Sequence, residues 1–352
     1  MALYPLLRPL AFAFDAERAH RLTIRALKLL PAGRPAPPDP LLASRVAGLD
    51  FPNPVGLAAG FDKDAEVHDR MLGFGFGFVE VGTLTPRPQT GNPPPRLFRL
   101  AEDRAAINRL GFNNHGQAAA LGRLERRDRR RGIVGVNVGA NKDKAAGDAA
   151  IADYVAGVRA MRGVADYLTI NISSPNTAGL RALQDKSVLD ALLAAVIEAR
   201  DAGPPKPPIF LKVAPDLERQ DVDDIAAVAL ARGIDALIVG NTTISRPILT
   251  SAHRDEAGGL SGAPLKALAL ARLRDFRRAT EGRLPLIACG GIETGADALD
   301  RIRAGASLVQ LYTALVYEGP GLAARINRTL RQLLECEGFA HLTEAIGTER
   351  PV

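Results

Sequence analysis

The stretch Tyr167-Leu168-Thr169-Ile170-Asn171-Ile172-Ser173-Ser174-Pro175-Asn176-Thr177 joins a short apolar run to a cluster of polar side chains. Its first part, residues 167–170, has the length and composition of a buried strand. Amides, hydroxyls and a proline follow, and these groups can form hydrogen bonds with something outside a sheet. The stretch therefore predicts a strand that ends at a functional site.

Similar apolar runs recur from residue 54 onward, and helical patterns lie between and after them. The predicted strands cover residues 55–58, 78–81, 133–138, 167–171, 209–213, 236–239, 286–289 and 308–312. The helical patterns cover residues 64–73, 114–130, 149–162, 187–201, 221–232, 264–279, 295–304 and 321–335. Eight strands, each followed by a helix, predict the α/β fold called the (β/α)8 or TIM barrel, because a doubly wound sheet rarely needs eight strands.

A (β/α)8 barrel carries its chemistry at the carboxyl ends of its strands. Polar residues and glycines gather at all eight predicted ends. They are Ala59 to Lys63, Gly82 and Thr83, Asn137, Asn171 and Ser174, Lys212, Asn241 to Thr243, Gly290 and Gly291, and Tyr312 and Thr313.

Lys63 and Lys212 are the two cations among these strand ends. Strand alternation over residues 209–213 directs Lys212 into the barrel. An inward lysine near a barrel mouth suits either an anion or an imine with a carbonyl substrate, and the residues alone leave both open. Gly290 and Gly291 stand where barrels often bind phosphate through backbone N–H groups. The glycine-rich loop at residues 258–262 allows a planar ligand to lie against the backbone.

The connection from residue 83 to residue 115 is long for a compact barrel, which predicts a wall or lid over the site. Asn108 is its most plausible substrate contact. None of the five histidines lies in a strand-end motif, which argues against a hydrolase triad built on Ser174. Cys289 and Cys336 are far apart and lack metal-ligand spacing, so the sequence predicts no disulfide and no metal site and fits a reducing cytoplasm.

Residues 1–40 form a predicted N-terminal segment separate from the barrel at residues 41–352. Pro5 and Pro9 delimit a first apolar piece, and Asp15 is the expected N-cap of a second helix over residues 16–30. That helix has an apolar face and a basic stripe, which fits either packing on the barrel or attachment to a membrane surface. The apolar face holds Ala19, Leu22, Ala26, Leu29 and Leu30; the stripe holds Arg18, Arg21, Arg25 and Lys28. The proline-rich stretch at residues 31–40 is expected to be a stiff linker.

The formal charge of +6 is concentrated in two places, residues 1–34 and the arginine cluster at residues 123–131. The rest of the chain is slightly acidic, so a nucleic-acid partner is not expected. No apolar run approaches the roughly 18 residues that span a bilayer, and residues 1–30 lack the pattern of a secretory signal.

Together, these motifs resemble those of the class 2 dihydroorotate dehydrogenases, the membrane-associated, quinone-dependent family of pyrimidine synthesis. The resemblance covers nearly the whole chain, including the N-terminal extension. It rests on residues 56–64 (GLAAGFDKD), 82–88 (GTLTPRP), 108–114 (NRLGFNN), 171–177 (NISSPNT), 241–243 (NTT) and 258–262 (GGLSG). Phe61 stands where the family normally has leucine, and Gly240 where it commonly has threonine.

The resemblance implies that dihydroorotate is oxidised to orotate through FMN, with a membrane quinone as electron acceptor. The implied FMN contacts are Ala59, Gly60, Phe61, Asp62, Lys63, Thr83, Asn137, Asn171, Lys212, Gly240, Gly262, Gly291, Tyr312 and Thr313. The implied substrate contacts are Lys63, Asn108, Arg109, Leu110, Gly111, Phe112, Asn171, Asn176, Asn241 and Thr242. Ser174 is the implied catalytic base, which removes the C5 proton while a hydride leaves C6 for the flavin.

In such a family the N-terminal helices dock on the membrane surface and line a tunnel for the quinone. His20, Arg99 and Tyr312 are the candidate tunnel residues, and the protein is expected to lie peripherally on the cytoplasmic face of the membrane. Two alternatives are a non-redox barrel lyase or aldolase with an imine-forming Lys63 or Lys212, and a membrane-bound sensor that binds orotate without turnover.

Overall fold

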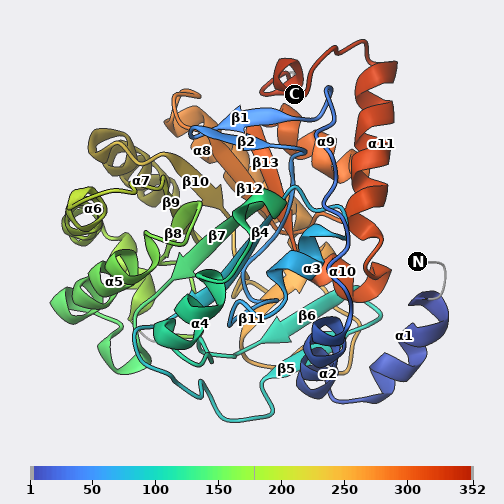
Figure 1. The fold of residues 1–352 in the computed structure, drawn as a ribbon, viewed down its shortest axis with the longest axis horizontal. Coiled ribbons are helices and arrows are strands. Elements are labelled where there is room, and N and C mark those ends of the chain that lie inside the picture. The colour runs from blue at the N-terminus through green and yellow to red at the C-terminus, as the bar shows by residue number, and fades with distance from the viewer. Residues whose placement is uncertain (1–3, 178, 350–352) are drawn as a thin grey trace.

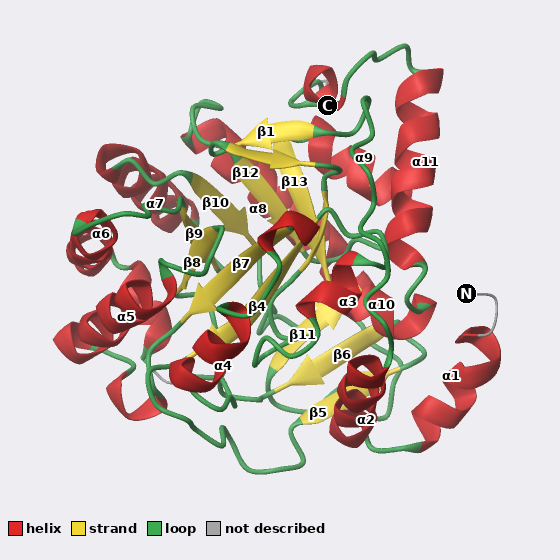
Figure 2. Cartoon of the chain, viewed as in Figure 1, coloured by secondary structure: helices red, strands yellow, loops and turns green. Residues whose placement is uncertain are grey.

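The computed structural model describes residues 4–177 and 179–349, and its centre is a closed barrel of eight parallel strands (Figures 1 and 2). The (β/α)8 fold class is therefore confirmed. In barrel order the strands are β3 (Val55–Leu57), β4 (Phe78–Leu84), β7 (Ile133–Val138), β8 (Tyr167–Asn171), β9 (Ile209–Val213), β10 (Ala236–Val239), β12 (Leu286–Cys289) and β13 (Ala306–Leu311). These strands are almost wholly buried because helices cover their outer face and side chains fill the interior.

Helices surround the barrel as the alternating pattern predicts (Figure 2). They are α3 (His68–Leu72), α4 (Gln117–Leu124), α5 (Gly147–Met161), α6 (Lys186–Asp201), α7 (Arg219–Arg232), α8 (Lys266–Ala279), α9 (Gly295–Arg303) and α11 (Leu322–Cys336). A short extra helix, α10 (Thr313–Glu318), follows the eighth strand and was not predicted. The helix expected over residues 114–130 is shorter, because α4 stops at Leu124 and the arginines beyond it bind Asp166 and backbone carbonyls.

Aromatic rings fill the end of the barrel away from the predicted site. A hairpin of β1 (Ser44–Val46) and β2 (Leu49–Phe51) brings Phe51 against Phe78, with ring centroids 5.1 Å apart. Phe78 packs on Tyr167 at 6.3 Å, and Tyr167 stacks on Phe210 at 4.4 Å. The rings form a packed floor that supports the strands from inside.

A second, antiparallel sheet stands beside the barrel mouth and was not predicted. It consists of β5 (Leu97–Leu100), β6 (Ala105–Asn108) and β11 (Gly259–Gly262), in the order β11-β6-β5. Part of the expected lid connection and the expected glycine-rich loop are therefore strands. Phe98, Leu100, Ile107 and Leu260 give this sheet a small core of its own.

The N-terminal segment forms two helices, α1 (Tyr4–Ala13) and α2 (Ala16–Leu29), and α2 lies against β5 (Figure 1). The Asp15 side chain accepts a hydrogen bond from the Arg18 N–H at 2.9 Å, as the predicted N-cap requires. Pro9 lies inside α1, so the boundary expected at this proline is wrong. Residues 31–39 form no helix or strand. Among the helices in the described residues, none is long and apolar enough to cross a membrane.

Candidate active site

A cavity of about 480 Å³ opens at the carboxyl ends of the barrel strands and extends beneath α1 and α2. Most of the predicted cofactor and substrate residues line it. They are Ala59, Gly60, Phe61, Lys63, Thr83, Asn108, Leu110, Gly111, Phe112, Asn171, Ser174, Asn176, Lys212, Asn241, Thr242, Gly262, Gly291, Tyr312 and Thr313. The fold therefore brings together residues from seven of the eight strand ends and from the second sheet, whereas the end of β7 contributes none.

Four predicted site residues lie outside this lining. The Asp62 carboxylate accepts the backbone N–H groups of Glu66 and Val67 at 2.7 and 2.8 Å. Arg109 pairs with Glu256 at 2.8 Å, and Asn137 is fully buried in the barrel. Gly240 has a φ of 119°, and a Cβ there would fall 2.1 Å from the Cys289 carbonyl oxygen. These residues support the cavity wall, and the backbone explains why position 240 holds glycine.

Ser174 is buried, and its Oγ accepts the backbone N–H of Asn176 at 3.2 Å. The Asn176 amide in turn donates to the Asn108 Oδ1 at 3.2 Å, which joins the β8 loop to β6. Thr177 in the same loop and Thr242 each have a buried hydroxyl without a hydrogen-bond partner among the described residues. Thr242 also lines the cavity.

Two lysines contribute positive charge to the same cavity. Lys63 Nζ donates to the Asn113 Oδ1 at 2.7 Å, and burial lowers the pKa of Lys63 to about 8. Lys212 is buried beside Cys289, and both line the cavity. Because both cations line the cavity together with amide and hydroxyl side chains, the cavity suits an anionic, polar ligand.

Two glycines of the cavity lining, Gly262 and Gly291, have backbone conformations that exclude other residues. Gly262 has a φ of 100°, and a Cβ there would crowd the Arg104 carbonyl at 2.4 Å. Gly291 has a φ of 68°, and a Cβ there would meet the Lys266 backbone at 2.4 Å. Only glycine fits these two backbone conformations, and both glycines line the cavity.

The part of the cavity beneath the N-terminal helices is apolar and contains the three candidate tunnel residues. The His20 ring packs edge-on against Phe61 at 5.4 Å, and its Nδ1 lies 3.4 Å from the Tyr312 hydroxyl. Burial lowers the pKa of His20 to about 4, and the nearby Lys63 charge acts in the same direction. Arg99 donates to the Ala11 carbonyl at 3.0 Å. At neutral pH the imidazole is therefore uncharged, in keeping with its apolar surroundings.

Sequence reasoning missed two buried acidic residues next to the cavity. Glu17 of α2 forms a two-pronged ion pair with Arg96, with distances of 2.9 and 2.7 Å. Glu80 lies wholly buried inside the barrel. A signal for Glu80 was present, because it is an acid within the apolar run 78–81, where a charge needs partners. The Glu17–Arg96 pair carried no such signal, because 79 residues separate its members.

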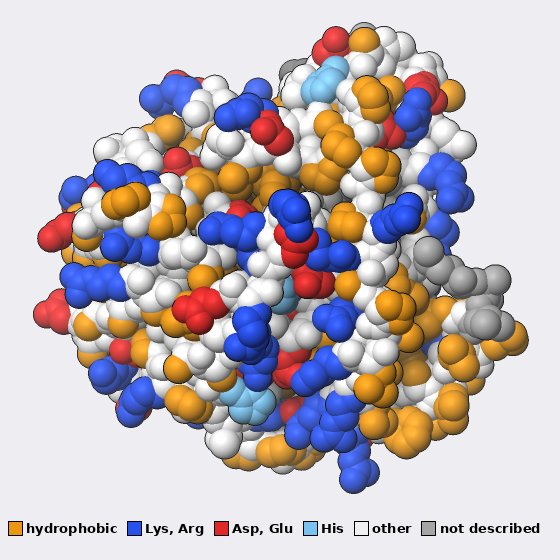
Figure 3. Space-filling view, viewed as in Figure 1, with side chains coloured by type: hydrophobic (Ala, Val, Ile, Leu, Met, Phe, Trp, Pro, Cys, Tyr) orange, Lys and Arg blue, Asp and Glu red, His pale blue; other side chains and the backbone are white. Residues whose placement is uncertain are grey.

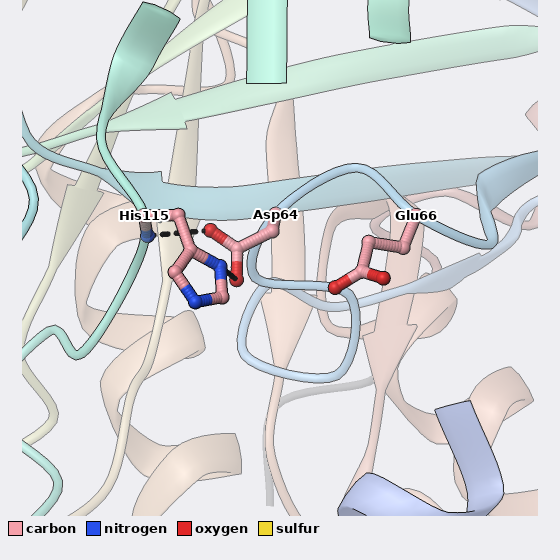
Figure 4. A group of neighbouring side chains, drawn as sticks. All are labelled: Asp64, Glu66 and His115. Atoms are coloured by element: carbon pink, nitrogen blue, oxygen red, sulfur yellow. Dashed lines mark hydrogen bonds and ion pairs between the residues drawn. The ribbon is translucent and has the colours of Figure 1, made fainter. Parts of the chain in front are cut away.

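Asp64, Glu66 and His115 form a cluster of titratable side chains outside the cavity (Figure 4). The ring Nδ1 of His115 lies 2.9 Å from the Asp64 carboxylate, and the backbone N–H of His115 donates to the same carboxylate at 2.7 Å. Glu66 pairs with Lys28 of α2. The group therefore joins the loop after β3 to the segment before α4 on one side and to the N-terminal helix on the other.

Fold and site together define a barrel enzyme whose strand ends surround a cavity that has two lysines beside an apolar chamber. The family model described as "Dihydroorotate dehydrogenase" matches residues 41–334. The chain therefore belongs to the dihydroorotate dehydrogenase family, which is flavin-dependent.

Individual relatives agree with this assignment over nearly the whole chain. A protein of Novosphingobium aromaticivorans called "Dihydroorotate dehydrogenase (quinone)" is 60% identical, and the match covers 99% of this chain and 100% of the relative. One of Sphingopyxis alaskensis with the same name is 62% identical, with 98% and 97% coverage. The Eimeria tenella DHODH crystal structure in complex with ferulenol superposes with a TM-score of 0.89 at 44% identity, with 95% and 96% coverage.

Proposed function

We propose that this protein oxidises dihydroorotate to orotate and passes the electrons to a membrane quinone. One observation carries the proposal: a single cavity joins a polar, cationic end at Lys63 and Asn108 to an apolar end at His20 and Leu27 of α2. A polar acid and a hydrophobic acceptor can thus both reach a cofactor placed between the two ends. The names of the relatives point to the same pair of substrates.

FMN fits the space between these ends. Gly262 and Gly291 line this space, and Lys212 would lie beside the ring as a counter-charge. Gln310 has a buried amide oxygen without a partner among the described residues, and Gln310 lines the cavity. When bound, FMN supplies the redox chemistry, because it accepts a hydride from the substrate and returns electrons to the quinone. The FMN contacts implied by the sequence remain our proposal, with Asp62, Asn137 and Gly240 acting from behind the cavity wall.

For the substrate, Lys63 would bind the carboxylate, and Asn108, Asn176, Asn241 and Thr242 would bind the amide groups of the ring. Leu110, Gly111 and Phe112 also line the cavity. Ser174 would take the C5 proton. Ser174 is buried, which supports this assignment because a base works best when it is shielded from bulk water.

For the membrane, the two N-terminal helices would lie on the lipid surface at the cytoplasmic face. Seven of the nine exposed large apolar side chains of the described residues lie on this segment: Leu6, Leu7, Leu10, Phe14, Leu22, Leu29 and Leu30. Figure 3 shows apolar side chains gathered over α1, with basic side chains nearby. Apolar insertion and attraction to anionic lipid together favour peripheral attachment.

The relatives' names do not favour the lyase or the orotate sensor. The test is to mix the FMN-loaded protein with dihydroorotate without oxygen. The flavin absorbance should bleach, and a quinone should restore it, whereas fumarate and NAD should not. A flavin that stays oxidised with dihydroorotate would refute the proposed function, and recovery with NAD but not quinone would refute the acceptor.

A further inference from the structure

Glu80 occupies the barrel interior with no exposed surface, and every neighbour that it bonds is a hydrogen-bond donor. Asn137 Nδ2 lies 2.7 Å from its Oε1. The Tyr167 hydroxyl, the Thr169 hydroxyl and the Gln310 amide nitrogen lie 3.0, 3.1 and 2.9 Å from its Oε2. Four donors around one carboxyl group match an ionised carboxylate, which only accepts hydrogen bonds.

The Glu80 carboxylate fixes the orientation of the Asn137 side-chain amide. An amide can present either its NH₂ or its oxygen to a neighbour, but only the NH₂ can bond a carboxylate. The Asn137 oxygen must therefore point the other way, toward the cavity. There it accepts the Thr83 hydroxyl at 2.6 Å and the Asn171 amide at 3.1 Å.

The same donor direction continues from Asn171 to the far side of the cavity. Because the Asn171 NH₂ is used toward Asn137, its oxygen is free to accept the Ser173 hydroxyl at 2.8 Å. The Ser173 oxygen then accepts the Asn241 amide at 2.8 Å. Each donor in this row points back toward the barrel interior, so the row has a single direction from Asn241 to Glu80.

We propose that Glu80 is a positioning residue that sets the donor direction of this row and thereby the polarity of two cavity residues. Thr83 donates its hydrogen to Asn137 and accepts the Asn171 amide at 3.0 Å, so toward a ligand its hydroxyl has only a lone pair to offer and is an acceptor. Asn241 has its oxygen engaged by the Thr242 N–H at 2.8 Å, so toward a ligand it is an N–H donor. Thr83 then suits an N–H group of the flavin, and Asn241 a carbonyl or carboxylate oxygen of the substrate. This inference rests on the proposed function.

The test is Glu80→Gln in the FMN-loaded protein. A glutamine that keeps the bonds to Tyr167, Thr169 and Gln310 presents its NH₂ to Asn137, so the Asn137 amide turns over and the row loses its direction. The dissociation constant of orotate, measured from its perturbation of the flavin absorbance, should rise about tenfold or more. The control is Tyr167→Phe, which removes another donor to Glu80 but leaves the row intact. It should bind orotate like the unsubstituted protein.

A double substitution distinguishes a positioning role of Glu80 from a general effect on protein stability. In Glu80→Gln with Asn137→Asp, the glutamine NH₂ can donate to the aspartate, whose other oxygen still accepts from Thr83 and Asn171. The donor direction is restored, so most of the lost orotate affinity should return. An orotate dissociation constant unchanged by Glu80→Gln, or one that the second substitution does not improve, would overturn the proposal.

If Glu80→Gln does not fold, Ser173→Ala provides an independent test of the proposed row of hydrogen bonds. Ser173→Ala breaks the row at its other end, and Ser173 does not line the cavity. Orotate binding should again weaken about tenfold, while FMN remains bound. Unchanged orotate affinity in folded Ser173→Ala would also overturn the proposal. If the unsubstituted, FMN-loaded protein itself failed to bind orotate, the proposed function would fall instead.

Discussion

Lys63 gives the substrate end of the cavity a pH dependence. Its pKa is lowered to about 8 because burial disfavours the ammonium form. Below pH 8 the free protein holds a cation for the orotate carboxylate, and above pH 8 that cation is lost. The orotate dissociation constant should therefore be flat below pH 8 and rise about tenfold for each pH unit above it.

The pH dependence is measured by titrating FMN-loaded protein with orotate from pH 6 to pH 10. Lys63→Met is the control, because it has no proton to lose. This variant should bind orotate weakly at every pH and show no break near pH 8. A break of the same size in the variant would assign the titration to another group.

Ser174 is the residue whose replacement should separate binding from proton removal. Ser174→Ala removes the hydroxyl together with its hydrogen bond from the Asn176 N–H, and FMN should stay bound because the proposed flavin contacts remain. Flavin reduction by dihydroorotate in a single turnover should slow by about 10²- to 10⁴-fold, the usual contribution of a positioned base. An unchanged rate would refute the base assignment and favour a sensor without turnover.

For single residues, the sequence predicted which polar side chains lie at the strand ends but not which groups those side chains bond. Nineteen of the predicted residues line the cavity, because a parallel barrel brings all strand ends to one rim. Asp62 and Asn137 were expected to contact the cofactor directly, yet their side chains are engaged by backbone and by Glu80. Residue type and order along the chain do not show which side of a strand end a side chain faces.

The ion pair of Glu17 with Arg96 holds α2 against the second sheet, because Arg96 directly precedes β5. Hydrogen bonds and charge from Arg96 lower the pKa of Glu17 to about 2, despite the opposing effect of burial. The pair therefore stabilises the docked helix above pH 4.5, and this contribution is lost as the pH falls from 4.5 toward 2. Arg96 also donates to the carbonyls of Thr90 and Asn92, so it ties α2 to the lid connection.

Glu17→Gln should loosen α2 because it leaves the buried Arg96 guanidinium without its counter-charge. Limited proteolysis should cut within residues 1–40 several-fold faster than in the unsubstituted protein. Quinone turnover should fall, whereas single-turnover flavin reduction by dihydroorotate should be preserved. The control is Asp50→Asn, which breaks the exposed pair of Arg45 with Asp50. Equal protease resistance in Glu17→Gln and the control would contradict this role.

Among the elements, long apolar runs were easy to predict and short paired strands were not. The bounds of β7, β8, β9, β10 and β12 match the predicted strands residue for residue. The β5-β6-β11 sheet was missed because β11 pairs with a strand about 150 residues earlier and contains two glycines. Such pairing depends on the barrel, which brings the two segments together, and has no local signal.

On the scale of the whole molecule, the exposed apolar face of α1 and α2 should govern membrane binding. Leu6 is 75% exposed and Leu29 is 87% exposed. Leu6→Asp with Leu29→Asp should sharply reduce sedimentation with vesicles that contain anionic lipid, because each aspartate adds a charge to the lipid-facing side. Flavin reduction by dihydroorotate should not change.

The control for this prediction is Ile248→Asp. Ile248 is 99% exposed, but it lies in the connection between β10 and β11, outside the N-terminal helices. This variant should sediment with vesicles as the unsubstituted protein does. If the double variant bound vesicles equally well, the lipid surface would have to contact another part of the molecule.

Because the cavity extends beneath α1 and α2, the rates with the two substrates should depend on concentrations in two different phases. A quinone that enters from the lipid is counted by its mole fraction in the bilayer, whereas dihydroorotate is counted by its molarity in water. Adding inert lipid at constant total quinone should therefore slow turnover by surface dilution, although nothing in the aqueous phase has changed. The rate of flavin reduction by dihydroorotate should not change when the same lipid is added.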